Sequence, residues 1–259
     1  MRTRFCSIAM AIAVLAAVPL FGQGFVGDLT SKDPPKGLDG PAPRTPDGKP
    51  DLSGLWQRPY VPDMSKNNKD GTQIGTPELP FTEAGMKAWK SYDAANGDYT
   101  GSCLPFGLMR SMNSPDPIQI MQSPKYVALL YEQNTWFHII PIGTQHHTNW
   151  SPTWFGDSVG HWEGDTFVVD TVNFNGRTRL DTIGHPHSDA LHVIERFTRT
   201  DAKHMGYEVT IDDPKTFTKP WTNKRIFTLR PDWEIMEYSC EENNKDLYDG
   251  HIKAPPPPK

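Results

Sequence analysis

The chain has 259 residues and a formal net charge of −5 at pH 7, and its lysines and arginines form no cluster. Because binding to nucleic-acid phosphates needs clustered basic side chains, this composition argues against a nucleic-acid partner. The eight tryptophans and the scarcity of continuous helical periodicity favour a packed β-rich domain.

The first residues predict export. Arg2 and Arg4 precede a nearly unbroken apolar run over residues 5–21, and Gly22 and Gly24 supply small residues at a cleavage site. We therefore expect a signal peptide over residues 1–24 and a periplasmic or secreted protein with no stable membrane insertion after cleavage. A retained membrane helix is the alternative, but the run is short for a bilayer core about 30 Å thick.

Removal of this leader leaves two cysteines, Cys103 and Cys240. An even pair in an oxidising compartment predicts a disulfide. Two buried free thiols are the alternative.

The rest of the chain divides by composition. Residues 25–50 are rich in proline and glycine and predict an extended arm, and the final residues 254–259 predict a disordered Pro-rich tail. Between them, residues 51–253 fit a single β-barrel-like domain.

Gly54 and Trp56 open this domain and match the G-x-W signature of lipocalins. The motif resembles the start of the first strand of a lipocalin barrel. An ordinary tryptophan that anchors the start of a strand is the alternative interpretation.

One helix and a series of strands are expected after this start. Thr82 is a candidate N-cap with Glu83 in the first turn, and Gly97 offers a stop. Short β-branched and aromatic runs predict the strands, and Gly164 suits a tight hairpin between two of them. A nearly closed antiparallel barrel, lipocalin-like, with one helix and an N-terminal arm is favoured because closure hides strand edges. The expected strands are Ile118–Gln122, Tyr126–Glu132, Trp136–Pro141, Ser158–Trp162, Thr166–Phe174, Leu191–Thr200, Met205–Asp212, Arg225–Leu229 and Trp233–Tyr238.

Alternation along two of these strands places carboxylates among apolar side chains. Asp170 shares a face with Val168 and Val172, and Glu195 shares a face with Val193 and Phe197. A carboxylate in such a position either pairs with a cation or has a raised pKa that suits acid–base work.

Long motifs across the mature chain resemble a poorly characterised family of exported proteins from soil bacteria. The resemblance implies export and carries over no catalytic residue. The motifs are PRTPDGKPDLSGLW, GHWEGDTFVVDTVNF, GHPHSDALHVIERF, YEVTIDDPKTFTKPW and CEENNKD.

Polar residues around the GHPHSDALHVIERF motif predict metal-free acid–base catalysis on a small, partly apolar molecule, of the lyase, isomerase or hydrolase type. Histidine exchanges protons near neutral pH, and a carboxylate orients it. No cofactor is required by this chemistry. The expected catalytic residues are His185, His187, Asp170 and Glu195, and the expected substrate-binding residues are Asn173, Asn175, Arg177, His192, Trp154 and His146.

Two adjacent histidines, His146 and His147, lie between predicted strands beside Trp150 and Trp154. An exposed loop pair and the rim of a pocket are the two interpretations. The rim interpretation underlies the inclusion of His146 and Trp154 among the substrate-binding candidates.

Two other functions fit the same residues. His185 and His187 point the same way on an extended segment and could ligate a divalent metal such as zinc, completed by Asp170, Glu195 or His192. Alternatively, the histidines cap strand ends and the barrel is a non-catalytic periplasmic protein that binds a small molecule.

Overall fold

The computed structural model describes residues 36–93, 98–242 and 244–245. The predicted signal peptide, the first part of the predicted arm and the predicted Pro-rich tail lie outside these residues. None of the helices in the described ranges combines the length and the apolar character needed to cross a membrane.

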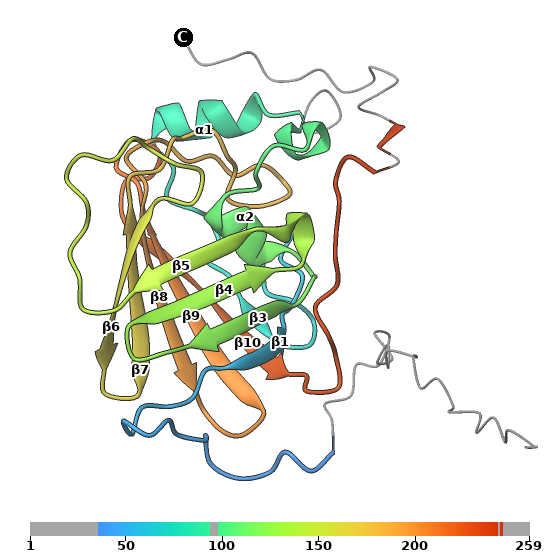
Figure 1. Cartoon of the computed structure of the whole chain (residues 1–259). Coiled ribbons are helices and arrows are strands. Elements are labelled where there is room, and N and C mark those ends of the chain that lie inside the picture. Colours follow the sequence, from blue (N-terminus) through green and yellow to red (C-terminus); the bar gives the residue numbers. More distant parts are fainter. Residues whose placement is uncertain (1–35, 94–97, 243, 246–259) are drawn as a thin grey trace, which may run out of the picture.

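The chain forms a mainly β, nearly closed antiparallel barrel, consistent with the expected lipocalin-like architecture (Figure 1). One sheet runs in the order β5-β4-β3-β1-β10-β9-β8-β7-β6, and β2 pairs with β10 beside this path. The strands are β1 (Gly54–Gln57), β2 (Gln73–Ile74), β3 (Ile118–Gln122), β4 (Tyr126–Tyr131), β5 (Phe137–Pro141), β6 (Asp157–Glu163), β7 (Thr166–Val172), β8 (His192–Arg199), β9 (His204–Asp212) and β10 (Trp221–Leu229).

The barrel is incompletely closed between β5 and β6, which we call the seam. Just after β5, Ile142 forms an isolated parallel bridge with Gly160 of β6, and the Gly143 amide donates to the Gly160 carbonyl at 2.8 Å. The long loop over residues 142–156 connects these two strands across the seam. At the seam, β5 and β6 therefore have no continuous ladder of backbone hydrogen bonds between them.

The Gly54 and Trp56 motif opens β1 for steric reasons. Gly54 has φ +135°, and a Cβ there would lie 2.5 Å from the Leu229 side chain. Trp56 is fully buried, donates from its indole nitrogen to the Leu52 carbonyl at 2.9 Å and lies under the Arg199 guanidinium. The motif thus sets the close approach of β1 to β10.

The strand pattern follows the expected alternation. Along β8 and β9 the alternate residues are buried, and the hairpin between β6 and β7 turns through Gly164 at φ +59° with Glu163 opposite Thr166. A glycine is favoured at this position because an L side chain rarely adopts positive φ.

The expected helix is confirmed as α1 (Glu83–Lys90), which lies across one end of the barrel (Figure 1). Thr82 caps it by accepting the Gly85 amide at 3.0 Å, and the acidic first turn complements the helix dipole. Two 3₁₀ turns cover Tyr99–Ser102 and Gln133–Thr135.

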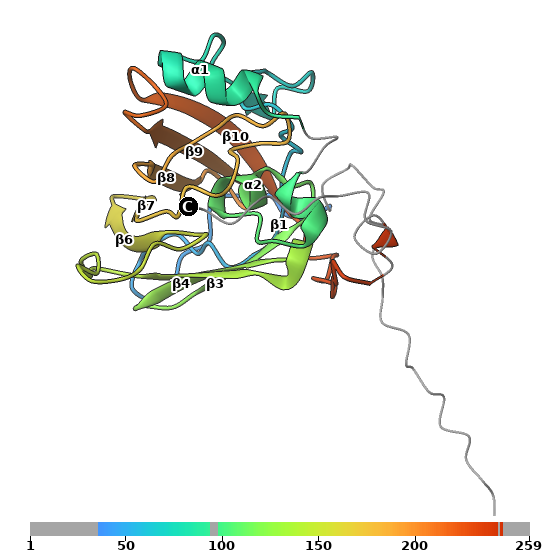
Figure 2. The same ribbon diagram turned by 90° about the horizontal axis from the view of Figure 1, so that it is seen from above.

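A second helix, α2 (Leu108–Asn113), was not expected. All six of its residues are buried, and the view from above shows it between the two sides of the barrel (Figure 2). Six residues make fewer than two helical turns, and the polar residues Arg110, Ser111 and Asn113 are buried together with the apolar ones, so the segment carries no clear helical signal in the sequence.

The expected strand Trp233–Tyr238 is wrong, because this segment forms no strand. Both edges of β10 are already paired, with β9 on one side and with β1 and β2 on the other. Instead, the Arg230 guanidinium lies 4.1 Å from the Trp233 ring centre, and the Met236 amide donates to Glu132.

The expected disulfide between Cys103 and Cys240 is present and closes a sequence separation of 137 residues. It joins the segment after the first 3₁₀ turn to the segment that follows the barrel. A disulfide is consistent with an oxidising compartment.

Candidate functional site

A cavity of about 410 Å³ opens at the seam, and we call it the seam pocket. It combines aromatic and aliphatic walls with a few imidazole, carboxylate and hydroxyl groups, which is the usual make-up of small-molecule sites. Its lining residues are Tyr126, His138, Ile139, Pro141, Thr144, Gln145, His147, Trp150, Gly156, Asp157 and Ser158.

Two buried polar side chains meet across the seam in this pocket. His138 of β5 and Ser158 of β6 approach to 2.7 Å between Nε2 and Oγ, and Ser158 Oγ is also 2.8 Å from Thr171 Oγ1. Burial lowers the pKa of His138 to about 4, so the ring is neutral at physiological pH. Its Nδ1 is buried and has no hydrogen-bond partner within the described residues. His138 lines the pocket, although Nδ1 itself is closed off from solvent.

A buried carboxylate orients a second imidazole of the pocket. Asp157 accepts the backbone N–H of His147 at 2.7 Å and lies 3.0 Å from its Nδ1. Burial opposes ionisation of Asp157, but the hydrogen bonds from His147 outweigh it and lower the pKa of the carboxyl. The His147 ring stacks on Trp150, with ring centres 3.6 Å apart. In the part of the chain that the structure describes, Nε2 of His147 has no hydrogen-bond partner.

The polar groups continue from the pocket onto the outer face of β7 and β8. His146 Nε2 and His192 Nε2 each lie 3.0 Å from Oδ1 of Asp170, and His146 Nδ1 lies 3.3 Å from Oδ2 of Asp157. Three of the residues singled out in the sequence thus come together, although from three separate segments. We call His146, Asp170 and His192 the triad.

The histidines of the expected catalytic set have other partners. His185 is buried and pairs through Nδ1 with Asp181 at 2.6 Å, packed against the ring of Trp89. His187 accepts at Nε2 from Thr178 at 2.6 Å and donates from Nδ1 to the Ser188 carbonyl, and burial lowers its pKa. The structure therefore does not bring either histidine together with Asp170.

Glu195 lies in the barrel interior, away from the seam pocket. It accepts the Tyr207 hydroxyl at 2.8 Å, and burial raises its pKa to about 7. The interior around it is filled by α2, whose Met112 carbonyl accepts from Arg225 at 2.9 Å. Of the two interpretations of this carboxylate, a cation partner or a raised pKa, the environment of Glu195 favours the raised pKa.

The Glu195→Gln variant tests this interior carboxyl. A folded-state pKa near 7, above the ordinary value of 4.5, means that the folded protein retains a proton which the unfolded chain releases. The resulting stabilisation is complete below pH 4.5 and is lost as the pH rises through 7. We expect the stability of the wild type relative to Glu195→Gln to fall by about 3 kcal/mol between pH 4 and pH 8, measured by urea unfolding. A change below about 1 kcal/mol would mean an ordinary carboxyl pKa.

The expected substrate-binding residues after β7 hold the 142–156 loop in place. The Asn173 side chain donates to the Trp150 carbonyl at 3.1 Å, and the Arg177 guanidinium lies 4.6 Å from the Trp154 ring centre. Asn175 accepts the Arg177 amide within a turn. These contacts support the segment that carries His146 and His147.

One group of side chains could hold a metal by proximity alone. The ligand atoms of Asp63, Asp181 and His185 all lie within 4.8 Å of one another. The donor types suit a divalent ion, but Asp181 already accepts the Met64 amide and, from His185, the backbone N–H and the ring Nδ1–H. Hydrogen bonds to Asp181 therefore explain why Asp181 and His185 lie together. The group contains His185 but not His187, so it is not the pair of metal ligands expected from the sequence.

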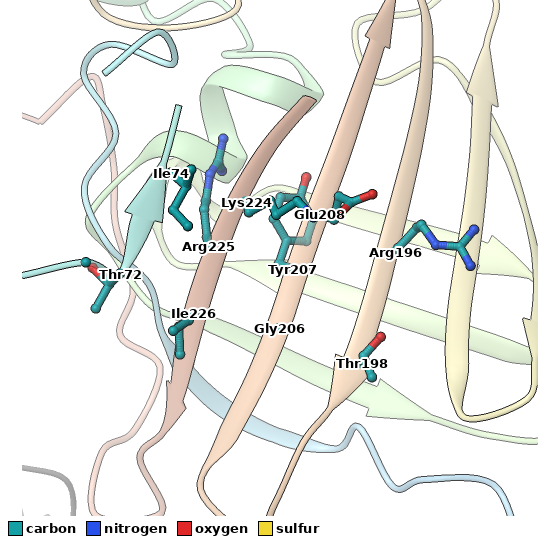
Figure 3. Close-up of a pocket in the computed structure, with 11 residues that line it drawn as sticks. Thr72, Ile74, Arg196, Thr198, Gly206, Tyr207, Glu208, Lys224, Arg225 and Ile226 are labelled. Atoms are coloured by element: carbon teal, nitrogen blue, oxygen red, sulfur yellow. Dashed lines mark ion pairs between the residues drawn. The ribbon is translucent and has the colours of Figure 1, made fainter. Parts of the chain in front are cut away.

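A second cavity, of about 330 Å³, lies on the outer face of β8, β9 and β10 (Figure 3). Its exposed charged groups are paired, since Lys224 lies 2.6 Å from Glu208 and Arg196 lies 2.6 Å from Glu163. Tyr207 and Arg225 add no exposed side chain to this cavity, because both side chains are buried in the barrel. This groove thus offers fewer groups for chemistry than the seam pocket.

Sequence reasoning missed Asp157, His138 and Ser158, and it named His147 only as one of an adjacent histidine pair, outside the expected site residues. Alternation along β5 was a usable signal, because His138 and Ile140 are buried while Phe137 and Ile139 are exposed. The meeting of β5 with β6 depends on barrel closure, which no local pattern contains. A comparison with known protein families and with curated proteins finds no match to this chain.

Proposed function

We propose that this chain is an exported enzyme that acts on a small, partly apolar organic molecule by acid–base chemistry in the seam pocket. His147 is the proton-transfer group, and Asp157 orients it. The proposal rests on the buried carboxylate of Asp157, which accepts the backbone N–H of His147 and lies 3.0 Å from its ring Nδ1. The other ring nitrogen, Nε2, remains available in the pocket.

The Asp157 and His147 pair has the properties that acid–base catalysis needs. The carboxylate fixes the ring orientation and the Nδ1–H tautomer, so the lone pair of Nε2 accepts a proton from a bound molecule. The ionised carboxylate then stabilises the imidazolium that forms. Proton return from Nε2 completes an isomerisation, an elimination or a hydrolysis without a cofactor.

His138 and Ser158 have a different role in this proposal. A neutral ring with a low pKa is a weak base, and no carboxylate orients its Nδ1 among the described residues. These facts argue against Ser158 as a nucleophile of the serine-hydrolase kind. The pair instead supplies hydrogen-bonding positions that orient a polar group of the substrate.

The walls set the class of substrate. Tyr126, Ile139, Pro141 and Trp150 supply aromatic and aliphatic surface, and the cavity volume of about 410 Å³ suits a small organic molecule. A partly apolar compound with one ionisable or carbonyl-bearing end matches this distribution of walls and polar groups.

A non-catalytic small-molecule-binding protein is the second candidate. The neutral His138 favours it, because an imidazole with this pKa serves as a hydrogen-bond partner rather than as an acid or base. The same pocket would then hold its ligand unchanged.

Untargeted mass spectrometry tests the two candidates. The purified mature protein is incubated with a mixture of small organic metabolites, and both retained and converted compounds are measured. We expect conversion of at least one compound, slowed about 100-fold or more in His147→Gln and strongly in Asp157→Asn. His161→Gln is the matched control, because His161 is likewise an exposed histidine that pairs with a carboxylate, Glu163, but it lies on β6 and does not line the seam pocket.

The outcomes separate the candidates. Conversion that is insensitive to both pocket variants would place the chemistry elsewhere. Retention of a compound without conversion would favour the binding protein. Neither retention nor conversion, with the fold intact by circular dichroism, would contradict a functional seam pocket.

A further inference from the structure

We propose that the seam pocket takes an uncharged amphiphile, whose polar head lies in the pocket and whose apolar chain lies along the outer face of β3, β4 and β5. This inference rests on the proposed function, because it names the substrate class of the same pocket. We call the outer surface of these three strands the apolar face. Its outward side chains are Gln119, Met121, Tyr126, Ala128, Leu130, Phe137, Ile139 and Pro141.

The apolar face is continuous and open to solvent. The strand register places Ala128 between Met121 and Ile139, and it places Leu130 opposite Phe137. Phe137 is 63% exposed, Met121 57% and Ile139 46%. An antiparallel sheet that faces water usually carries polar side chains on that face, and a contiguous exposed apolar patch marks an interaction site. The face therefore needs an apolar occupant.

The rest of the outer sheet follows the usual polar pattern. The outer face of β7 and β8 carries Asp170 and His192 of the triad, and Lys224 pairs with Glu208 on β10 and β9. One sheet thus has a charged outer half and an apolar outer half. The apolar character is specific to the strands that lead to the seam.

The apolar face runs directly into the seam pocket. Tyr126, Ile139 and Pro141 belong both to the face and to the pocket lining. His138 lines the pocket as well, although its side chain lies on the buried side of β5. The pocket therefore opens at the edge of β5, where the two sides of this strand meet. A chain that leaves the pocket over Ile139 next meets Ala128.

The charges of the pocket favour an uncharged head. Among the described residues that line it, Asp157 alone carries a formal charge when the histidines are neutral. A carboxylate head would meet this like charge without a lysine or arginine to bind it. Both carboxylate oxygens of Asp157 are already engaged by His147, so a cationic head gains little. A hydroxyl head, in contrast, donates to Nε2 of His147 without a charge penalty.

A second copy of this chain or a lipid bilayer would also cover an apolar surface. Either of them would cover Tyr126 and Ile139 together with the rest of the face, and these two side chains are also walls of the pocket. An amphiphile occupies the pocket and the face at the same time. The continuity of the two surfaces therefore favours an amphiphile.

Nuclear magnetic resonance titration of the tag-free mature protein with 1-hexanol, 1-octanol and 1-decanol tests the proposal. We expect the affinity to rise about two- to fourfold for each added CH₂ group, because each group buries apolar surface. Decanol should also shift the backbone amide signals of Met121 and Ala128. The Met121→Gln/Phe137→Gln double variant should lose the gain from octanol to decanol and keep the affinity for hexanol. Ile226→Gln is the matched control, because Ile226 is 45% exposed on the outer face of β10.

The proposal is overturned if the affinity does not rise with chain length, if the double variant keeps the full rise, or if Ile226→Gln loses it equally. Two further results would also contradict it. A wild-type dimer that dissociates in the double variant would assign the face to a second copy. Binding to phosphatidylcholine vesicles that the double variant loses, without binding of the alcohols, would assign it to a bilayer.

The variant His147→Gln separates this proposal from the proposed catalysis. It should retain the dependence of affinity on chain length, because it leaves the apolar face intact. Chain-length dependence without conversion of any compound would contradict the acid–base mechanism alone. Conversion that depends on His147 but is insensitive to the Met121→Gln/Phe137→Gln substitutions would contradict the role of the apolar face alone.

Discussion

The Cys103→Ser/Cys240→Ser double variant is expected to lose up to about 5 kcal/mol of unfolding free energy, because the disulfide closes a sequence separation of 137 residues. In the chain-entropy model, a long closed loop restricts the unfolded ensemble strongly. The bridge also attaches the segment after β10 to the rest of the protein, where the Met236 amide donates to Glu132. Urea unfolding of the wild type and of the double variant measures the loss.

Reduction of the wild type is the matched control for this prediction. Dithiothreitol should lower the wild-type unfolding midpoint to that of the double variant and leave the double variant unchanged. Free alkylation of both thiols in the unreduced, denatured protein would show that the bridge does not form in the cell. An unchanged midpoint in both comparisons would mean that the loop closure contributes nothing to stability.

The strands of the barrel could be predicted from the sequence because each of them is marked by a local pattern of residues. Eight of the expected strands overlap observed strands, and the turn at Gly164 and the N-cap at Thr82 also match. Each of these features depends on residues that are neighbours in the chain. Alternation and capping are read directly from such short windows.

The elements that were missed depend on the tertiary structure. The α2 helix has only six residues, and half of them are polar although all are buried, so its sequence gives no readable helical pattern. The segment Trp233–Tyr238 has strand-like composition, but β10 offers it no free edge. In both cases the surroundings, rather than the residues themselves, determine the backbone.

None of the residues that line the seam pocket was among the expected site residues, for the same reason. Asp170, His146 and His192 were among the expected residues, and the structure brings these three together. His185 and His187 have similar composition around them, yet each is held by a partner in its own segment, Asp181 and Thr178. Composition locates polar residues on strands and loops, but only the closure of the barrel decides which of them meet.

Closure of the barrel also determines where a ligand can bind. The barrel interior holds α2 and a buried set of polar side chains around Glu195, so small molecules are excluded from the position they would occupy in an empty barrel. The seam between β5 and β6 supplies a cavity instead, bordered by the loop that carries His146 and His147. The incomplete sheet thus connects the fold to the proposed site in the seam pocket.

Trp56→Ala is expected to lower the free energy of unfolding by about 3–5 kcal/mol, because the substitution leaves a cavity in the core. The indole is fully buried, donates to the Leu52 carbonyl and lies under Arg199. The cavity would open where β1 joins β3 to β10, so loss of this side chain weakens the connection between the two sides of the barrel.

Trp150→Ala is the matched control, since the same substitution there removes an indole that is 55% exposed. Its expected cost is below about 1 kcal/mol, because exposed side chains contribute little to stability. Urea unfolding followed by circular dichroism measures both variants without relying on tryptophan fluorescence. Equal losses in the two variants would contradict the anchoring role of Trp56, and a loss below about 1 kcal/mol for Trp56→Ala would place its side chain outside the core.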